Sequence, residues 1–127
     1  MPQTAAAAIF NVTGRVMLLG IIGRVTTAIQ NQANNTKLTA NPSAASVAST
    51  DLCATASLAN DAVGTLYGIT GTFATALQKG GAIPMPALPI ILQAGTIDLD
   101  CSASNTGQVA WEVFYVPLDA GSKVTAA

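Results

Sequence analysis

The chain has no histidine, and only 9% of its 127 residues are charged, whereas soluble domains typically carry about 25%. The commonest general base and the commonest transition-metal ligand are therefore missing. No G-x-S-x-G motif and no Gly-rich phosphate loop occurs, and the two cysteines, Cys53 and Cys101, have neither CxxC spacing nor a histidine partner. These absences predict a protein that is not an enzyme and that uses no cofactor and no metal ion.

Clusters of positive charge and long apolar runs are missing as well. The five cationic residues are scattered singly and the net charge is -1, so we expect no nucleic acid partner, which would need grouped cations to neutralise phosphates. The longest apolar run, Val16 to Ile22, is bounded by Arg15 and Arg24 and falls far short of the ~20 residues of a membrane span. We therefore expect no membrane partner and interpret this run as a buried strand or strand pair.

The N-terminus lacks a basic region ahead of an apolar one, so no secretory signal is expected. Cys53 and Cys101 could pair in an oxidising compartment, but free, buried thiols are the favoured interpretation. A disulfide is not needed for folding, because a chain of 127 residues can bury roughly two-thirds of its unfolded surface in a single core.

Half of the residues are apolar and the mean hydropathy is +0.49. Few charges are thus left to cover an isolated surface. We expect much of the exterior to be buried against copies of the chain or against another protein. The alternative is a monomer whose surface is covered by Ala, Thr, Asn and Ser.

Short strand-like segments separated by Gly, Asn and Pro dominate the chain. Three glycines interrupt the β-branched stretch from Ile9 to Gln30, Asn41-Pro42-Ser43 is a turn signal, and three prolines interrupt Ile83 to Pro89. No amphipathic helix of convincing length occurs. The pattern predicts an all-β fold, a single-domain β-sandwich, jelly roll or small barrel over residues 9–127. Residues 1–8 are expected to form an N-terminal arm that is free to lie on a neighbouring subunit.

Two alternating runs flank Asn105-Thr106-Gly107 between Thr96 and Pro117, a pattern typical of a β-hairpin. A three-residue loop would set Leu99 opposite Val113 and make one face of the hairpin wholly apolar, whereas a one-residue slip would mix the faces. That apolar face is the predicted core, and it consists of Ile97, Leu99, Cys101, Trp111, Val113 and Tyr115.

The other face of this hairpin would carry Asp98, Asp100 and Glu112, with Asp100 directly across from Glu112. Opposed like charges are destabilising unless they are neutralised. The neutralising group could be a cation from Arg15 or Arg24 of another subunit, which makes these five residues the candidate interface. A calcium-type cation, a glycosidase-type carboxylate pair and a merely solvated face are the alternatives.

Trp111 and Tyr115 lie two positions apart on one strand face and could form a sugar-stacking platform. Because their expected neighbours are Cys101 and Ile97, packing in the core is the favoured interpretation.

The C-terminal stretch CSASNTGQVAWEVFYVPLDAGSKV resembles the ending of small virion proteins of tailed bacteriophages, in its Thr-Gly-x-Val-x-Trp-x-x-x-Tyr-x-Pro-Leu strand followed by Asp-x-Gly. Upstream, Gly23 to Leu38, Leu52-Cys53 and Gly64 to Tyr67 are similar to other parts of these proteins, and together the stretches cover about half of the chain.

The resemblance is to head decoration, or cement, proteins. It implies a β-barrel or jelly-roll subunit that forms homotrimers on the capsid exterior, binds the major capsid protein and is assembled in the host cytoplasm. It implies no catalytic residues. The alternative is a sugar- or receptor-binding β module of a phage spike or tail fibre.

Overall fold

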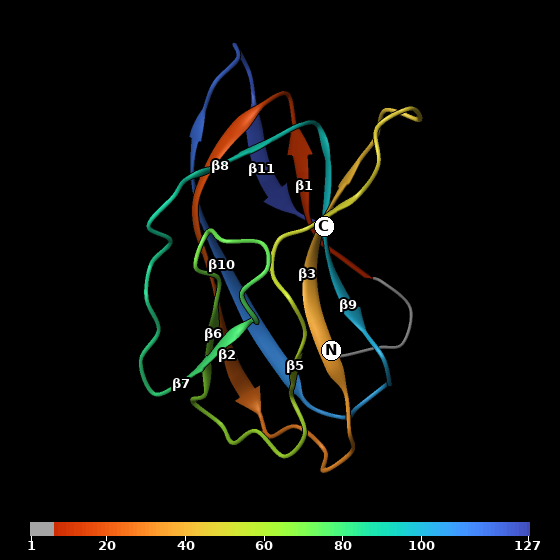
Figure 1. Cartoon of the computed structure of the whole chain (residues 1–127), viewed down its shortest axis with the longest axis vertical. Helices are drawn as coiled ribbons and strands as arrows, with labels where there is room; N and C mark the ends of the chain where they lie inside the picture. Colours follow the sequence, from red (N-terminus) through yellow and green to blue (C-terminus); the bar gives the residue numbers. More distant parts are fainter. Residues whose placement is uncertain (1–6) are drawn as a thin grey trace.

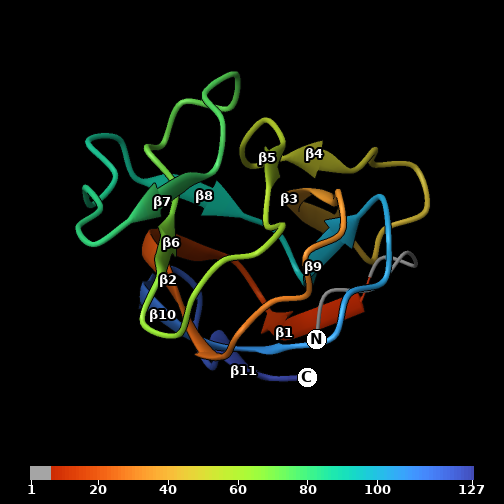
Figure 2. The same ribbon diagram turned by 90° about the horizontal axis from the view of Figure 1, so that it is seen from below.

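The structure, a computed structural model, describes residues 7–127 and consists of two antiparallel sheets packed face to face (Figures 1 and 2). The described chain contains no helix, and so none that could cross a membrane. This architecture confirms the predicted all-β sandwich. Sheet A contains β1 (Ala7–Thr13), β3 (Asn35–Pro42), β4 (Thr50–Asp51), β5 (Ala56–Ser57), β9 (Gly95–Cys101) and β11 (Lys123–Ala126). Sheet B contains β2 (Val16–Thr27), β6 (Leu66–Gly68), β7 (Gln78–Gly80), β8 (Ile90–Leu92) and β10 (Gln108–Pro117).

The strand order is β11-β1-β9-β3-β4 in sheet A, where β5 also pairs with β3. In sheet B the order is β10-β2-β6-β7, and β8 pairs with the first residues of β2. β10 pairs with β2 from Gln108 to Pro117, with register shifts at two places. Sheet B is therefore built around β2, which contains the apolar run that was expected to form a buried strand or strand pair and which forms part of one strand.

Inward-facing side chains of both sheets form one core. Along β2 the buried residues Val16 and Leu18 alternate with the more exposed Met17 and Leu19, as the two-residue period of a strand requires. Opposite them, Leu38 and Ile97 of sheet A are fully buried. The thiols of Cys53 and Cys101 are buried in this core and free. Free, buried thiols were the favoured interpretation of the sequence.

The hairpin predicted around Asn105-Thr106-Gly107 is wrong. β9 belongs to sheet A, where it pairs with β1 and β3, and β10 belongs to sheet B, where it pairs with β2. The chain crosses from one sheet to the other between Cys101 and Gln108. Two strands that are each apolar on one side can bury that side as neighbours in one sheet or as members of two sheets that face each other across a core. The alternation of apolar and polar residues is the same in both arrangements, so it could not decide between them.

The six apolar residues assigned to the hairpin face the interior of the sandwich nonetheless. Ile97, Leu99 and Cys101 are buried on the sheet A side, and the remaining three pack half-buried on the sheet B side. Those three residues are Trp111, Val113 and Tyr115.

The N-terminal arm expected over residues 1–8 lies mostly outside the described part of the chain. Its last two residues, Ala7 and Ala8, belong to β1 and pair with Leu99 and Asp98 of β9.

Candidate functional site

The acidic residues of the candidate interface do not share a face. Asp98 and Asp100 lie on β9 in sheet A, whereas Glu112 lies on β10 in sheet B. The predicted opposition of Asp100 and Glu112 is therefore wrong, for the same reason that the hairpin is wrong. Among residues 7–127 no group of three or more His, Cys, Asp or Glu side chains could hold a metal ion.

Asp100 has a cationic neighbour within its own chain. The Nζ atom of Lys37 lies 3.9 Å from Asp100 and 2.9 Å from the Asp51 carboxylate, and the hydrogen bond to Asp51 raises the pKa of Lys37. Asp98 is 7% exposed. One of its oxygens accepts a 3.4 Å hydrogen bond from Asn41, and the other has no partner in the described structure.

Arg15 is also paired within the chain. It donates from Nη2 to Asp119 at 2.8 Å, from Nε at 3.1 Å and from its backbone N–H at 3.0 Å. These bonds hold the pKa of the Asp119 carboxyl below its usual range and raise the pKa of Arg15. The pair joins the turn before β2 to the turn after β10, so Arg15 has a structural role and is no longer an unpaired cation.

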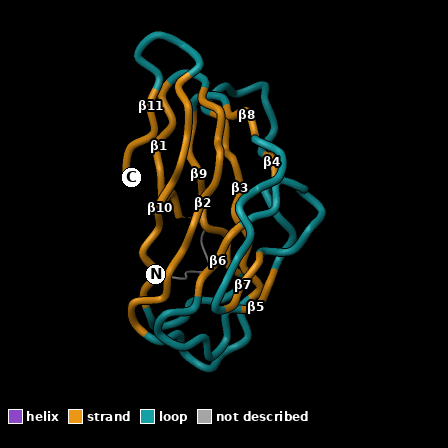
Figure 3. The backbone as a smooth tube through the Cα atoms, turned by 90° about the vertical axis from the view of Figure 1, so that its left-hand side faces the viewer, coloured by secondary structure: helices purple, strands orange, loops and turns teal. Residues whose placement is uncertain are grey.

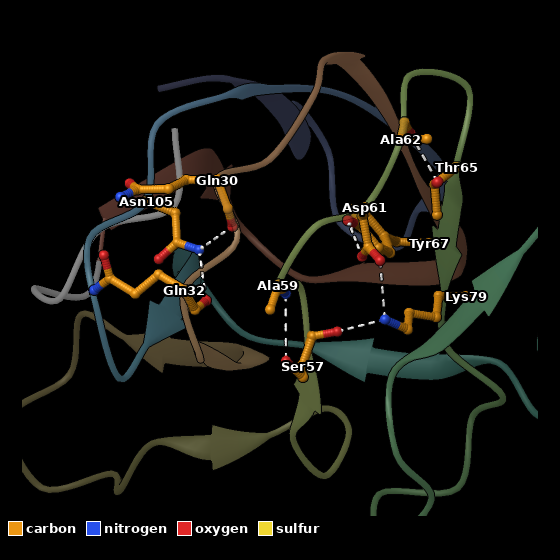
Figure 4. Close-up of polar contacts among 10 residues, drawn as sticks. All are labelled: Gln30, Gln32, Ser57, Ala59, Asp61, Ala62, Thr65, Tyr67, Lys79 and Asn105. Atoms are coloured by element: carbon orange, nitrogen blue, oxygen red, sulfur yellow. Dashed lines mark hydrogen bonds and ion pairs between the residues drawn. The ribbon is translucent and has the colours of Figure 1, made fainter.

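A polar cluster holds one end of the sandwich together (Figure 4). The buried Tyr67 donates a 2.6 Å hydrogen bond from its hydroxyl to Asp61, and Lys79 donates to Asp61 at 3.0 Å and to the carbonyl of Ser57 at 2.6 Å. Burial raises the pKa of the Tyr67 phenol, and the bond to Asp61 adds to the rise. The cluster joins β6, β7 and the loop after β5, which accounts for its buried polar groups.

A second set of amides holds the crossing from β9 to β10. The buried Asn105 donates to the carbonyls of Gln30 and Gln32, at 3.1 and 2.9 Å, and accepts a 3.3 Å bond from Asn34 (Figure 4 shows the first two). Asn105 is therefore not part of the hairpin turn that was expected from the sequence. Its side chain instead satisfies the loop backbone that lies beneath the crossing.

The rings of Trp111 and Tyr115 do not form an exposed platform. Both pack half-buried against the core, and the indole stacks on Tyr67 with ring centroids 6.2 Å apart. A Cβ atom at Gly23 would lie 2.6 Å from the Trp111 ring, so the glycine makes room for the indole.

An exposed apolar surface covers the outer side of sheet B, and we call it the sheet B outer face. It combines outward-pointing residues of β2, β8 and β10, which lie side by side (Figure 3 views this side of the molecule). In one row across the three strands, Val116 lies opposite Met17 and Met17 opposite Ile91. The face consists of Met17, Leu19, Ile22, Ile91, Phe114 and Val116, of which Leu19, Ile91, Phe114 and Val116 are 37–58% exposed.

The proline-rich segment Gly81–Pro89 extends this face. It runs between β7 and β8 along the left-hand edge of Figure 1. Its Ile83 side chain packs on Gly68, and its Met85 side chain packs on Gly20 while staying 51% exposed. The segment thus covers two glycines of sheet B and adds apolar surface of its own.

The two remaining residues of the candidate interface, Arg24 and Glu112, lie on the same side of sheet B, at the border of the sheet B outer face. Arg24 is opposite Ala110 and Glu112 is opposite Ile22, so the two charges sit on neighbouring strands two residues apart. Both are exposed, and neither forms an ion pair within residues 7–127. The structure therefore separates Arg24 and Glu112 from the paired Arg15 and from Asp98 and Asp100.

A smaller apolar feature lies beside β8. A pocket of about 220 Å³ opens between this strand and the segment around β4, lined among others by Val47, Leu52, Phe73 and Ile91. Ile91 borders both this pocket and the sheet B outer face.

Sequence reasoning did not identify the apolar residues of the sheet B outer face. The signal was present in runs that are apolar at both alternating positions, Val16 to Leu19 and Val113 to Val116. A strand that is apolar on both sides is typical of a sheet covered on both faces.

No protein-family model, curated protein or solved structure matches this chain.

Proposed function

We propose that this protein is a structural subunit of a tailed-phage virion, a decoration or cement protein that binds copies of itself and the major capsid protein on the capsid exterior. The observation that carries the proposal is the sheet B outer face, an exposed apolar surface on paired strands. Surfaces of this kind mark sites of protein association. The resemblance of the C-terminal stretch to phage virion proteins supplies the context. The homotrimer that the resemblance implies is a separate expectation, which the sheet B outer face does not carry.

A cement subunit acts by contact alone. It bridges neighbouring capsid subunits through buried apolar and backbone contacts, and so opposes the internal pressure of packaged DNA without touching the DNA. The low share of charged residues, 9%, suits such buried contacts. The antiparallel sandwich suits them as well, because its strands are cross-linked by hydrogen bonds along their length.

Binding to capsids tests the proposal directly. The purified chain should sediment with empty capsids and should raise the temperature at which they release their contents. Phe114→Ser, which removes an apolar side chain from the sheet B outer face, should weaken both effects, because a subunit that no longer binds its own copies holds neighbouring capsid subunits together less well. Phe73→Ser is the matched control, because Phe73 is 45% exposed against 43% for Phe114 but lies beside the small pocket. A chain that never sediments with capsids would contradict the proposal.

A further inference from the structure

We propose that the sheet B outer face binds the same face of a second copy of the chain about a two-fold axis, with Arg24 of each copy paired to Glu112 of the other. The inference specifies the partner at the site of the proposed function and rests on the self-association part of that function.

The charges of the face identify the partner. Arg24 and Glu112 are single, opposite charges on neighbouring strands, and they are the only charged residues of β2 and β10. Neither has an ion-pair partner in the described chain. Covering such a face with an apolar partner would strip water from both charges without compensation. A second copy brings one anion and one cation, so that both charges are paired. The face is therefore complementary to itself, as a two-fold contact requires.

The strand register gives the orientation. An axis parallel to the strands and between β2 and β10 lays β10 of each copy over β2 of the other. Glu112 is opposite Ile22 within its own sheet, so in this arrangement it faces Ile22 of the second copy. Arg24 of the second copy lies two residues further along the same β2 strand, next to Glu112. Phe114 is opposite Gly20, so it lies over the second copy's Gly20 and the Met85 side chain packed there. Apolar groups thus meet apolar groups, and each charge meets its opposite.

The strands of the face supply about half of the area that a stable contact needs, and the segment beside them adds to it. β2 has 12 residues, which span about 40 Å at about 3.3 Å per residue. β2 and β10, spaced at about 4.8 Å, are about 10 Å wide and give roughly 400 Å² over this length. The third strand, β8, has three residues and widens the face only beside Val16 to Leu18. The segment Gly81–Pro89 widens the face further, toward the roughly 800 Å² per partner of a standard interface.

Charge reversal tests the pairing. Arg24→Glu and Glu112→Arg should each shift the protein toward monomers, weakening self-association by about tenfold or more, because each variant sets like charges against each other twice per interface. A mixture of the two variants should associate again, since one carries only anions at these positions and the other only cations. Lys123→Glu is the matched control, because Lys123 lies on the edge strand β11 of sheet A and should leave association unchanged.

Light scattering gives the mass of each sample, and energy transfer between differently labelled variants detects the mixed pair. Circular dichroism of each variant establishes that it is folded. A wild-type chain that is monomeric at high concentration, or a trimer that neither reversal disturbs, would overturn the inference. Capsid sedimentation is measured separately. If the chain forms dimers through this contact but never binds capsids, the decoration role is wrong. The two-fold contact would still be supported by that result.

Discussion

Trp111 and Gly23 lie opposite one another on β10 and β2, and the indole ring covers the glycine so closely that a Cβ atom at position 23 would lie 2.6 Å from its Cζ3 atom. The same ring stacks on Tyr67 of β6, on the other side of β2. One glycine thus lets an aromatic side chain pack across three strands of sheet B, a close approach that any larger residue would block.

Gly23→Ala should destabilise the fold, because the added methyl group forces Trp111 out of its position. Overpacking of this kind costs about 1–3 kcal/mol of unfolding free energy. Urea unfolding followed by fluorescence measures the change, and the emission reports on the site directly because the chain has a single tryptophan. Gly81→Ala is the control, since nothing lies within 4 Å of the Cβ position there. Equal stability of the two variants would contradict this packing.

The inward-facing residues of the sandwich could be predicted from the sequence, but their pairing could not. The alternation in Ile97–Cys101 and Val109–Tyr115 identifies the buried side of each strand. It does not say whether the two strands bond to each other or face each other across the core. That choice depends on long-range partners, β1 and β3 for β9 and β2 for β10, which a local pattern does not contain.

The candidate interface stays a prediction. Its five charged residues depend on a hairpin that would bring the acidic ones together, and the structure has no such hairpin. Arg24 and Glu112 lie on the same side of sheet B because β10 pairs with β2. These two strands are more than eighty residues apart in the sequence, so a local pattern could not predict their pairing. Arg15 could not be distinguished from Arg24 by sequence, because its partner Asp119 lies in a turn at the far end of the chain.

Asn105→Ala should destabilise the crossing between the sheets. The change removes two hydrogen bonds to the carbonyls of Gln30 and Gln32 and leaves the Asn34 amide without its acceptor in a buried site. Buried polar groups left unpaired cost about 1–3 kcal/mol. Chemical denaturation should show this loss, whereas Asn31→Ala, an exposed position in the same loop, should unfold like the wild type.

Asp119 should titrate below the ordinary aspartate value of about 3.9, because Arg15 donates three hydrogen bonds to its carboxylate and lowers its pKa. The stabilisation from a lowered pKa is present above the ordinary value and is lost as the pH falls through the lowered one. Carboxyl-carbon NMR measures the midpoint directly. In Arg15→Ala the midpoint should move up toward the ordinary value, and an unchanged midpoint would show that the guanidinium is not its cause.

Tyr67 should stay protonated in the folded protein well above the ordinary phenol pKa of about 10, because burial and the bond to Asp61 raise its pKa. The raised pKa contributes to the free energy of unfolding, and this contribution is fully present below about pH 10. It is lost as the pH rises toward the raised pKa, because between these two values Tyr67 ionises only in the unfolded state. The chain has two tyrosines, so Tyr115→Phe leaves Tyr67 as the only phenol. Absorbance at the phenolate band in that variant should then rise only together with unfolding, followed by circular dichroism. A phenolate signal that appears while the fold is intact would mean that Tyr67 is accessible and that its bond to Asp61 does not hold the proton.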